Sequence, residues 1–120
     1  MLSKGKRIGV ALMSVLISPL VMVGAAGTSA AHAPCGRTAP DLDDSSWVYT
    51  ANSNHMRTGS LDTCGSNGIA YSSHQLDYHC WTSASNGQGW TYARNNTTGA
   101  TGWIKNLYLD DYGSAVHCGF

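Results

Sequence analysis

Four cysteines, Cys35, Cys64, Cys80 and Cys118, are the residues of this chain best suited to chemistry. Two of them directly follow a histidine, in His79-Cys80 and His117-Cys118, and this repeated dipeptide raises a metal site as an alternative. Adjacent residues of a strand point to opposite faces, however, so one His-Cys pair cannot easily bind a single ion. We therefore predict two disulfides and no metal site.

The pairing of the cysteines stays open, because four cysteines allow three connectivities. We favour Cys64–Cys80 as a local bridge inside the fold and Cys35–Cys118 as a bridge that closes its ends. Loop-closure entropy gives the short bridge about 3 kcal/mol of stabilisation and the long one more than about 4. A domain with a total stability of about 5–15 kcal/mol could unfold without either bridge.

The chain offers few groups for catalysis. It contains no glutamate and no Gly-x-Ser-x-Gly motif, and its cysteines are expected to be oxidised. A ribonuclease-like histidine pair stays open as an alternative, although the same histidines suit polar positions on strand faces. The candidates for that pair are His55, His74, His79 and His117. We predict a protein that is not an enzyme and needs no cofactor.

Aromatic side chains indicate binding instead. The chain has four tryptophans and six tyrosines, more than so small a core can bury completely. Some rings should therefore be exposed, where they can anchor peptides or sugars. Strand alternation places Trp81 on the face opposite Cys80, which makes it the better candidate for exposure. The predicted ligand-binding residues are Trp81, Tyr71, Tyr78, Tyr92 and Arg57.

The elements that must position these side chains are short strands. Residues 75–81 alternate, with Leu76, Tyr78 and Cys80 on the inward face, and Asn86-Gly87 predicts a hairpin turn after them. Because no segment has helical periodicity, we predict an all-β domain over residues 47–120, either a small antiparallel barrel or two orthogonally packed sheets. An arm, residues 34–46, precedes it and is expected to be held only at its cysteine. The predicted strands lie at 47–50, 55–58, 68–71, 75–81, 90–94 and 102–105.

Three motifs occur in the order and spacing of a known family. They are Arg57-Thr58-Gly59-Ser60, Gly89-Trp90, and Gly102-Trp103-Ile104 followed by Tyr108-Leu109. Across about residues 47–118 the chain resembles the bacterial Src-homology-3 (SH3) family, in its small secreted actinobacterial form. The resemblance implies an SH3-like antiparallel barrel of about five strands that recognises cell-wall peptide or an extended peptide in a groove.

The chain departs from that family in two respects. Ser60 stands where the family usually has proline, which should loosen the turn into the following loop. The cysteines add a bridge that cytosolic relatives would lack, in the loop that usually helps to line the groove. The resemblance also implies that Trp90 and Trp103 are largely structural.

The first residues predict export. A basic start that ends at Arg7 is followed by an apolar run to Val23 and by small residues to Ala31, the layout of a secretory signal peptide. The apolar run is short for an alternative membrane anchor. We place the signal at residues 1–33 and favour cleavage after Ala31, because Pro34 disfavours a cut directly before it.

Removal of the signal leaves four cations against seven aspartates, a formal net charge of −3. Without a basic stripe, neither nucleic acid nor an anionic membrane is an expected partner. We predict a secreted, monomeric, non-catalytic module that binds peptidoglycan, cell-wall peptide or another extracellular peptide or protein. Two alternatives stay open: an inhibitor or toxin that acts through the disulfide-clipped loop 59–67, and a structural surface protein that self-associates through its aromatic side chains.

Overall fold

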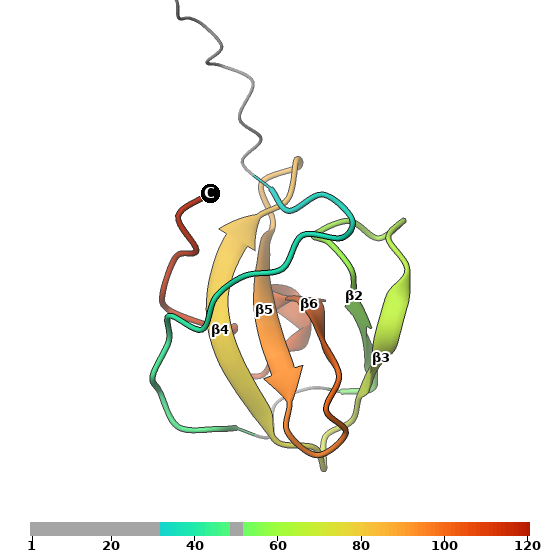
Figure 1. Cartoon of the computed structure of the whole chain (residues 1–120), viewed down its shortest axis with the longest axis vertical. Coiled ribbons are helices and arrows are strands. Elements are labelled where there is room, and N and C mark those ends of the chain that lie inside the picture. The colour runs from blue at the N-terminus through green and yellow to red at the C-terminus, as the bar shows by residue number, and fades with distance from the viewer. Residues whose placement is uncertain (1–31, 49–51) are drawn as a thin grey trace, which may run out of the picture.

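The computed structural model describes residues 32–48 and 52–120. Residues 1–31 of the predicted signal therefore lie outside the described residues, as do residues 49 and 50 of the strand predicted at 47–50. None of the described residues belongs to a helix long and apolar enough to cross a membrane. The strands are β2 (Asn54–Arg57), β3 (Ser66–Ala70), β4 (Leu76–Ser83), β5 (Gly89–Asn95) and β6 (Thr101–Lys105), followed by the short 3₁₀ helix η3 (Asn106–Tyr108) (Figure 1).

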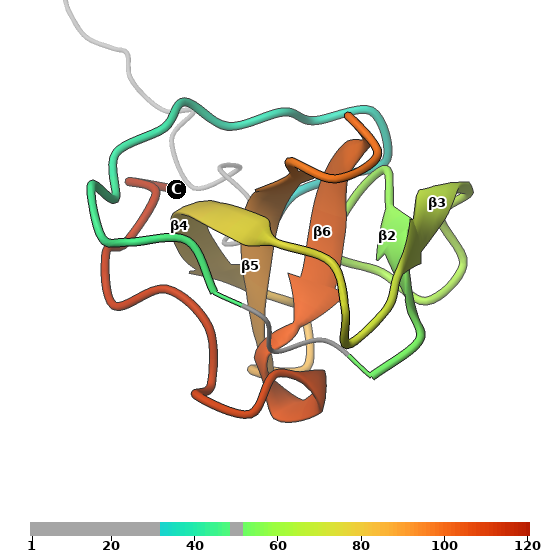
Figure 2. The same ribbon diagram turned by 90° about the horizontal axis from the view of Figure 1, so that it is seen from below.

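The five strands form one antiparallel sheet in the order β3-β2-β6-β5-β4 (Figure 2). The predicted all-β fold is confirmed, and Gly87 sits at φ 89° in the predicted hairpin turn between β4 and β5. The predicted closure into a barrel is wrong, since β3 and β4 do not pair. A physical reason is that other residues occupy the outer edge of β4: Val48 pairs with Leu76, and His117 pairs with Trp81.

A β-bulge in β4 divides the core into two clusters. Leu76, Tyr78 and Cys80 are all buried, as the alternation predicts. Tyr78 pairs with Ala93 and Cys80 pairs with Tyr92, so His79 is an extra residue on β4. The sequence predicts that Cys80 shares one face of the strand with Leu76 and Tyr78. Because of the bulge, Cys80 belongs instead to a different core cluster from these two residues. One cluster contains Met56, Ala70, Leu76, Tyr78, Ala93, Ile104 and Leu109, and the other contains Ala33, Ala39, Cys80, Ala84, Trp90, Tyr92, Trp103 and Cys118.

The arm, residues 34–46, is fixed at several points and not only at Cys35. Near the end of β2, the Gly36 amide donates to the Thr58 carbonyl oxygen at 2.9 Å. Over β6, the indole N–H of Trp103 donates to the Arg37 carbonyl oxygen at 2.7 Å. At β4, the amides of residues 42 and 43 both donate to the carbonyl oxygen of His79. The arm thus crosses one face of the sheet from β2 to β4 (Figures 1 and 2).

Asp43 anchors the far end of the arm. Its buried carboxylate accepts a hydrogen bond from Ser114 Oγ at 2.5 Å and another from the Ser45 amide at 2.9 Å. Burial by itself raises the pKa of Asp43, but these hydrogen bonds lower it by more, so the pKa lies below its ordinary value. The carboxylate therefore stays charged and joins the arm to the segment after η3.

The structure confirms two disulfides but not the favoured pairing. Cys35 is bonded to Cys64, and Cys80 is bonded to Cys118. The arm carries Cys35 past the loop that follows β2, where Cys64 lies. The C-terminal segment runs beside β4, with its Cys118 amide donating to the carbonyl oxygen of Trp81. Both contacts depend on where the two terminal segments pack, which strand patterns do not reveal.

Ser60 is fully buried and does not loosen the chain as its departure from proline suggested. Its amide donates to the carbonyl oxygen of Ala33 at 2.8 Å, and its Oγ accepts from the Ala33 amide at 2.9 Å. Beside it, a Cβ atom on Gly59 would lie 2.7 Å from the carbonyl oxygens of Ala33 and Pro34. Gly59 leaves room for the backbone of Ala33 and Pro34, and the Ser60 amide donates to it. Together these two residues allow the start of the arm to pack against this turn.

Candidate functional site

Three adjoining hollows surround Lys105, which lines all of them at the end of β6. The two larger ones have volumes of about 210 and 280 Å³. We call the three together the Lys105 groove. The lining includes Arg57, Asp62, Trp90 and Tyr108 in the 210 Å³ hollow, and Leu107 and Tyr112 in the 280 Å³ hollow.

The Lys105 ammonium is held in a fixed position. Its Nζ lies 2.9 Å from Asp62 Oδ2, and 5.6 and 5.3 Å from the ring centres of Trp90 and Tyr108. The hydrogen bond to Asp62 raises the pKa of Lys105 by more than burial lowers it, so the group remains a cation. The Lys105 side chain is only 14% exposed, whereas that of Asp62 is 66% exposed. The groove thus presents an ordered cation beside an accessible carboxylate.

Apolar and aromatic groups surround these charges. Leu107, Tyr108 and Tyr112 are among the large exposed hydrophobic residues of the domain. Tyr112 has a φ of 67°, a left-handed conformation that is uncommon for a bulky residue and that recurs where strain serves function. The Trp90 Nε1 is buried and makes no hydrogen bond within the described residues. Such a mixture suits a ligand with both charged and aliphatic parts.

Among the predicted ligand-binding residues, only Arg57 lies in the groove. Its Nη1 donates to the carbonyl oxygen of Cys64 at 3.0 Å, which orients the guanidinium. Tyr71 is exposed elsewhere and packs edge-on against His74. Trp81 is half-buried against the ring of His117, with 4.7 Å between the ring centres.

The other two predicted residues belong to the core. Tyr78 is buried, and its hydroxyl donates to Asp111 Oδ1 at 2.7 Å. Tyr92 is buried against the rings of His79 and Trp103. Their rings face neighbouring side chains and not a surface that a ligand could reach.

Sequence reasoning missed Lys105, Leu107 and Tyr112. One signal was available: Lys105 is the only lysine after the predicted signal, and it directly follows the Gly102-Trp103-Ile104 motif. The loop 59–67 was singled out for an inhibitor, and the structure ties it down at Ser60, Cys64 and Asp62. It forms a wall of the groove.

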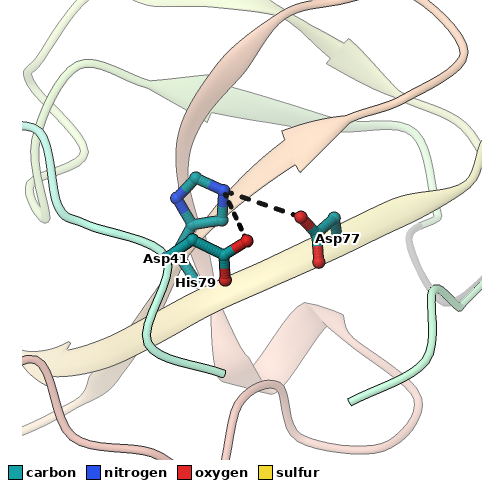
Figure 3. Close-up of side chains that lie close together, drawn as sticks. All are labelled: Asp41, Asp77 and His79. Atoms are coloured by element: carbon teal, nitrogen blue, oxygen red, sulfur yellow. Dashed lines mark ion pairs between the residues drawn. The ribbon is translucent and has the colours of Figure 1, made fainter. Parts of the chain in front are cut away.

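A second cluster lies on the face that the arm covers. His79 Nε2 is 3.9 Å from Asp41 Oδ2 and 3.8 Å from Asp77 Oδ2 (Figure 3). Burial raises the pKa of Asp77, and the neighbouring Asp41 carboxylate raises it further. We call these three residues the Asp41–Asp77–His79 cluster, and none of them lines the Lys105 groove.

Comparison with known protein families, with curated proteins and with solved structures finds no match to this chain.

Proposed function

We propose that the secreted form of this chain is an SH3-like, non-catalytic module that binds cell-wall peptide, or another extracellular peptide, in the Lys105 groove. The observation that carries the proposal is the fixed ammonium of Lys105 between two aromatic rings, with the exposed Asp62 carboxylate beside it. The two disulfides agree with an oxidising, extracellular compartment.

The groove matches the chemistry of a peptide. A ligand carboxylate can pair with Lys105 and Arg57, and a ligand amine can pair with Asp62. Aliphatic parts of the ligand can then pack on Tyr108 and Tyr112, whose polar tips remain in water. Cell-wall peptides combine free amines, carboxylates and short aliphatic side chains, and this is why we favour them over a wholly apolar ligand.

The SH3-like relationship rests on the motifs. Gly89-Trp90 opens β5, where Trp90 lines the groove, and Gly102-Trp103-Ile104 lies within β6. At Gly102 an added Cβ would lie 2.7 Å from the Met56 backbone. The motif therefore needs glycine here, because β6 lies too close to β2 for a side chain. The family proposal is supported because Trp90 lines the groove and Gly102 is required by the packing of β6 beside β2.

Replacing Lys105 with glutamine should weaken binding to a soluble cell-wall peptide at least ten-fold, because the ligand carboxylate loses its cation and Asp62 is left beside it. Isothermal titration calorimetry with a peptide that carries both a free amine and a free carboxylate measures this loss. Arg94→Gln is the matched control, since it removes an exposed cation from β5 outside the groove. Equal affinity for wild type and K105Q would overturn the groove assignment.

A pull-down with purified cell walls tests the wall ligand directly. The mature protein should sediment with the walls, and K105Q should stay largely in the supernatant. If the wild-type protein also stays wholly in the supernatant while it binds soluble peptides, the ligand is another extracellular peptide.

The mature chain should begin at His32. Ala33 is fully buried and exchanges two hydrogen bonds with Ser60, so cleavage after Ala33 would remove a residue that is built into the fold. Intact mass spectrometry of the secreted protein, before and after reduction, gives the terminus and the number of bridges together. A mass that starts at Pro34 contradicts this prediction.

A further inference from the structure

We propose that the Asp41–Asp77–His79 cluster is a Zn²⁺ site that fastens the arm to β4. This revises the sequence-based expectation of no metal site. The cluster joins residues from two segments, since Asp41 lies on the arm while Asp77 and His79 lie on β4. Each contributes one ligand atom, and the three atoms lie within 4.8 Å of one another.

The imidazole of His79 is oriented as in metal-binding histidines. Its Nδ1 lies 3.2 Å from the carbonyl oxygen of Ala39, and a carbonyl oxygen can only accept, so Nδ1 carries the hydrogen. In the neutral ring this leaves the lone pair on Nε2, which faces the two carboxylates (Figure 3). A backbone carbonyl on the other ring nitrogen is the usual support of a histidine that binds zinc.

No hydrogen bond between the imidazole and either carboxylate explains this arrangement. The Nε2–carboxylate distances of 3.8 and 3.9 Å are too long for one. Within the described residues, neither Asp41 nor Asp77 forms an ion pair with lysine or arginine. The side chains of His79 and Asp77 are only 14% and 15% exposed. Two carboxylates therefore share a partly dehydrated space. Among the described residues, the imidazole is the one group of opposite charge that pairs with them, and it carries that charge only when it is protonated.

The bulge in β4 contributes to the geometry. His79 is the extra residue of that bulge, and bulges commonly redirect a side chain near functional sites. The carbonyl oxygen of His79 accepts from the amides of Leu42 and Asp43 on the arm. The same residue thus positions the arm with its backbone and faces Asp41 with its ring.

Zinc suits these ligands best. Imidazole with carboxylates is a common zinc set, whereas calcium and magnesium prefer oxygen ligands alone. Zinc bonds of about 2.0–2.2 Å place tetrahedral ligands roughly 3.4 Å apart, so the two distances from His79 Nε2 to the carboxylates need to contract by about half an ångström. Asp41 is 47% exposed, so water can complete the coordination from that side.

Titration of EDTA-treated protein with ZnCl₂ tests the site. We expect saturable binding of one zinc ion and a melting temperature about 10 °C higher at a zinc concentration of 100 times Kd. His79→Gln and Asp41→Asn should each weaken zinc binding at least ten-fold. Asp41→Asn is the variant best suited to keep the fold, because its side chain is the most exposed of the three.

Controls separate this site from adventitious histidine binding. His55→Gln removes an exposed histidine of β2 and should leave zinc affinity unchanged. Resistance of the arm to limited proteolysis should rise with zinc in the wild type but not in Asp41→Asn. The proposal is overturned if no saturable binding occurs, or if His79→Gln and Asp41→Asn bind zinc as the wild type does. Peptide binding at the Lys105 groove is measured separately, so either proposal can fail alone.

Discussion

Replacing Ser60 with proline should destabilise the domain by about 3 kcal/mol or more, measured as the free energy of unfolding in urea. Proline has no amide hydrogen, so the carbonyl oxygen of Ala33 loses its 2.8 Å partner. The substitution also removes the Oγ that accepts from the Ala33 amide at a fully buried position. Two backbone groups of Ala33 are then left unpaired in the interior, at about 1–3 kcal/mol each.

This substitution also tests the family resemblance, because proline is the residue that the family usually has there. Ser60→Ala is the matched control: it keeps the amide donor, loses only Oγ, and should destabilise by about 1–2 kcal/mol. If the proline variant is as stable as the wild type, the arm does not dock on this turn as described. Retained stability would also indicate that this turn accepts the proline that the SH3 family usually has at this position.

Removing the Cys80–Cys118 bridge should lower the free energy of unfolding by about 4 kcal/mol. The bridge joins residues separated by 38 positions, and this is the loop-closure contribution for a ring of that size. Both cysteines are also buried in the cluster that contains Trp90 and Trp103, so Cys80→Ala/Cys118→Ala loses packing as well. For a domain of this size the melting temperature should fall by at least about 15 °C.

The double variant Cys35→Ala/Cys64→Ala provides the comparison. Its bridge spans 29 positions, and Cys35 is exposed, so loop closure contributes nearly as much while packing contributes less. A greater loss of stability here than at Cys80–Cys118 would contradict the account. Peptide mapping of the unreduced protein checks the connectivity itself, and a fragment joining Cys64 to Cys80 would show the other pairing.

Local patterns predicted much of the fold. The alternation of burial from Leu76 to Trp81 and the Asn86-Gly87 turn depend only on neighbours in the sequence, and both are found in the hairpin of β4 and β5. The bulge at His79, which moves Cys80 into a different core cluster from Leu76 and Tyr78, is not visible in that alternation. The open sheet and the disulfide pairing depend on where the two terminal segments pack. No periodicity records that His117 lies beside Trp81, or that Cys35 reaches Cys64.

The candidate site residues show the same contrast between those that local sequence patterns predict and those that depend on how distant segments pack. Arg57 was found because it belongs to a motif, while Tyr78, an aromatic residue outside the motifs, and Tyr92 prove to be core residues. The spacing of Asp77 and His79 on one strand was visible in the sequence. Their partner Asp41 comes from an arm that showed no pattern, and only the crossing of the sheet by that arm brings the three together.

The open sheet has a consequence for self-association. Short bridges from Val48 and His117 occupy the edge at β4, but among the described residues no strand pairs with the outer side of β3. Any strand added from a second copy would have to join there. The register shift opposite Met56 and Arg57 leaves Asn67 unpaired, and Gly68 at φ 155° bends the backbone beside it. An edge that is short and bulged is a poor template for strand addition, so the fold discourages polymerisation even where its sheet does not close.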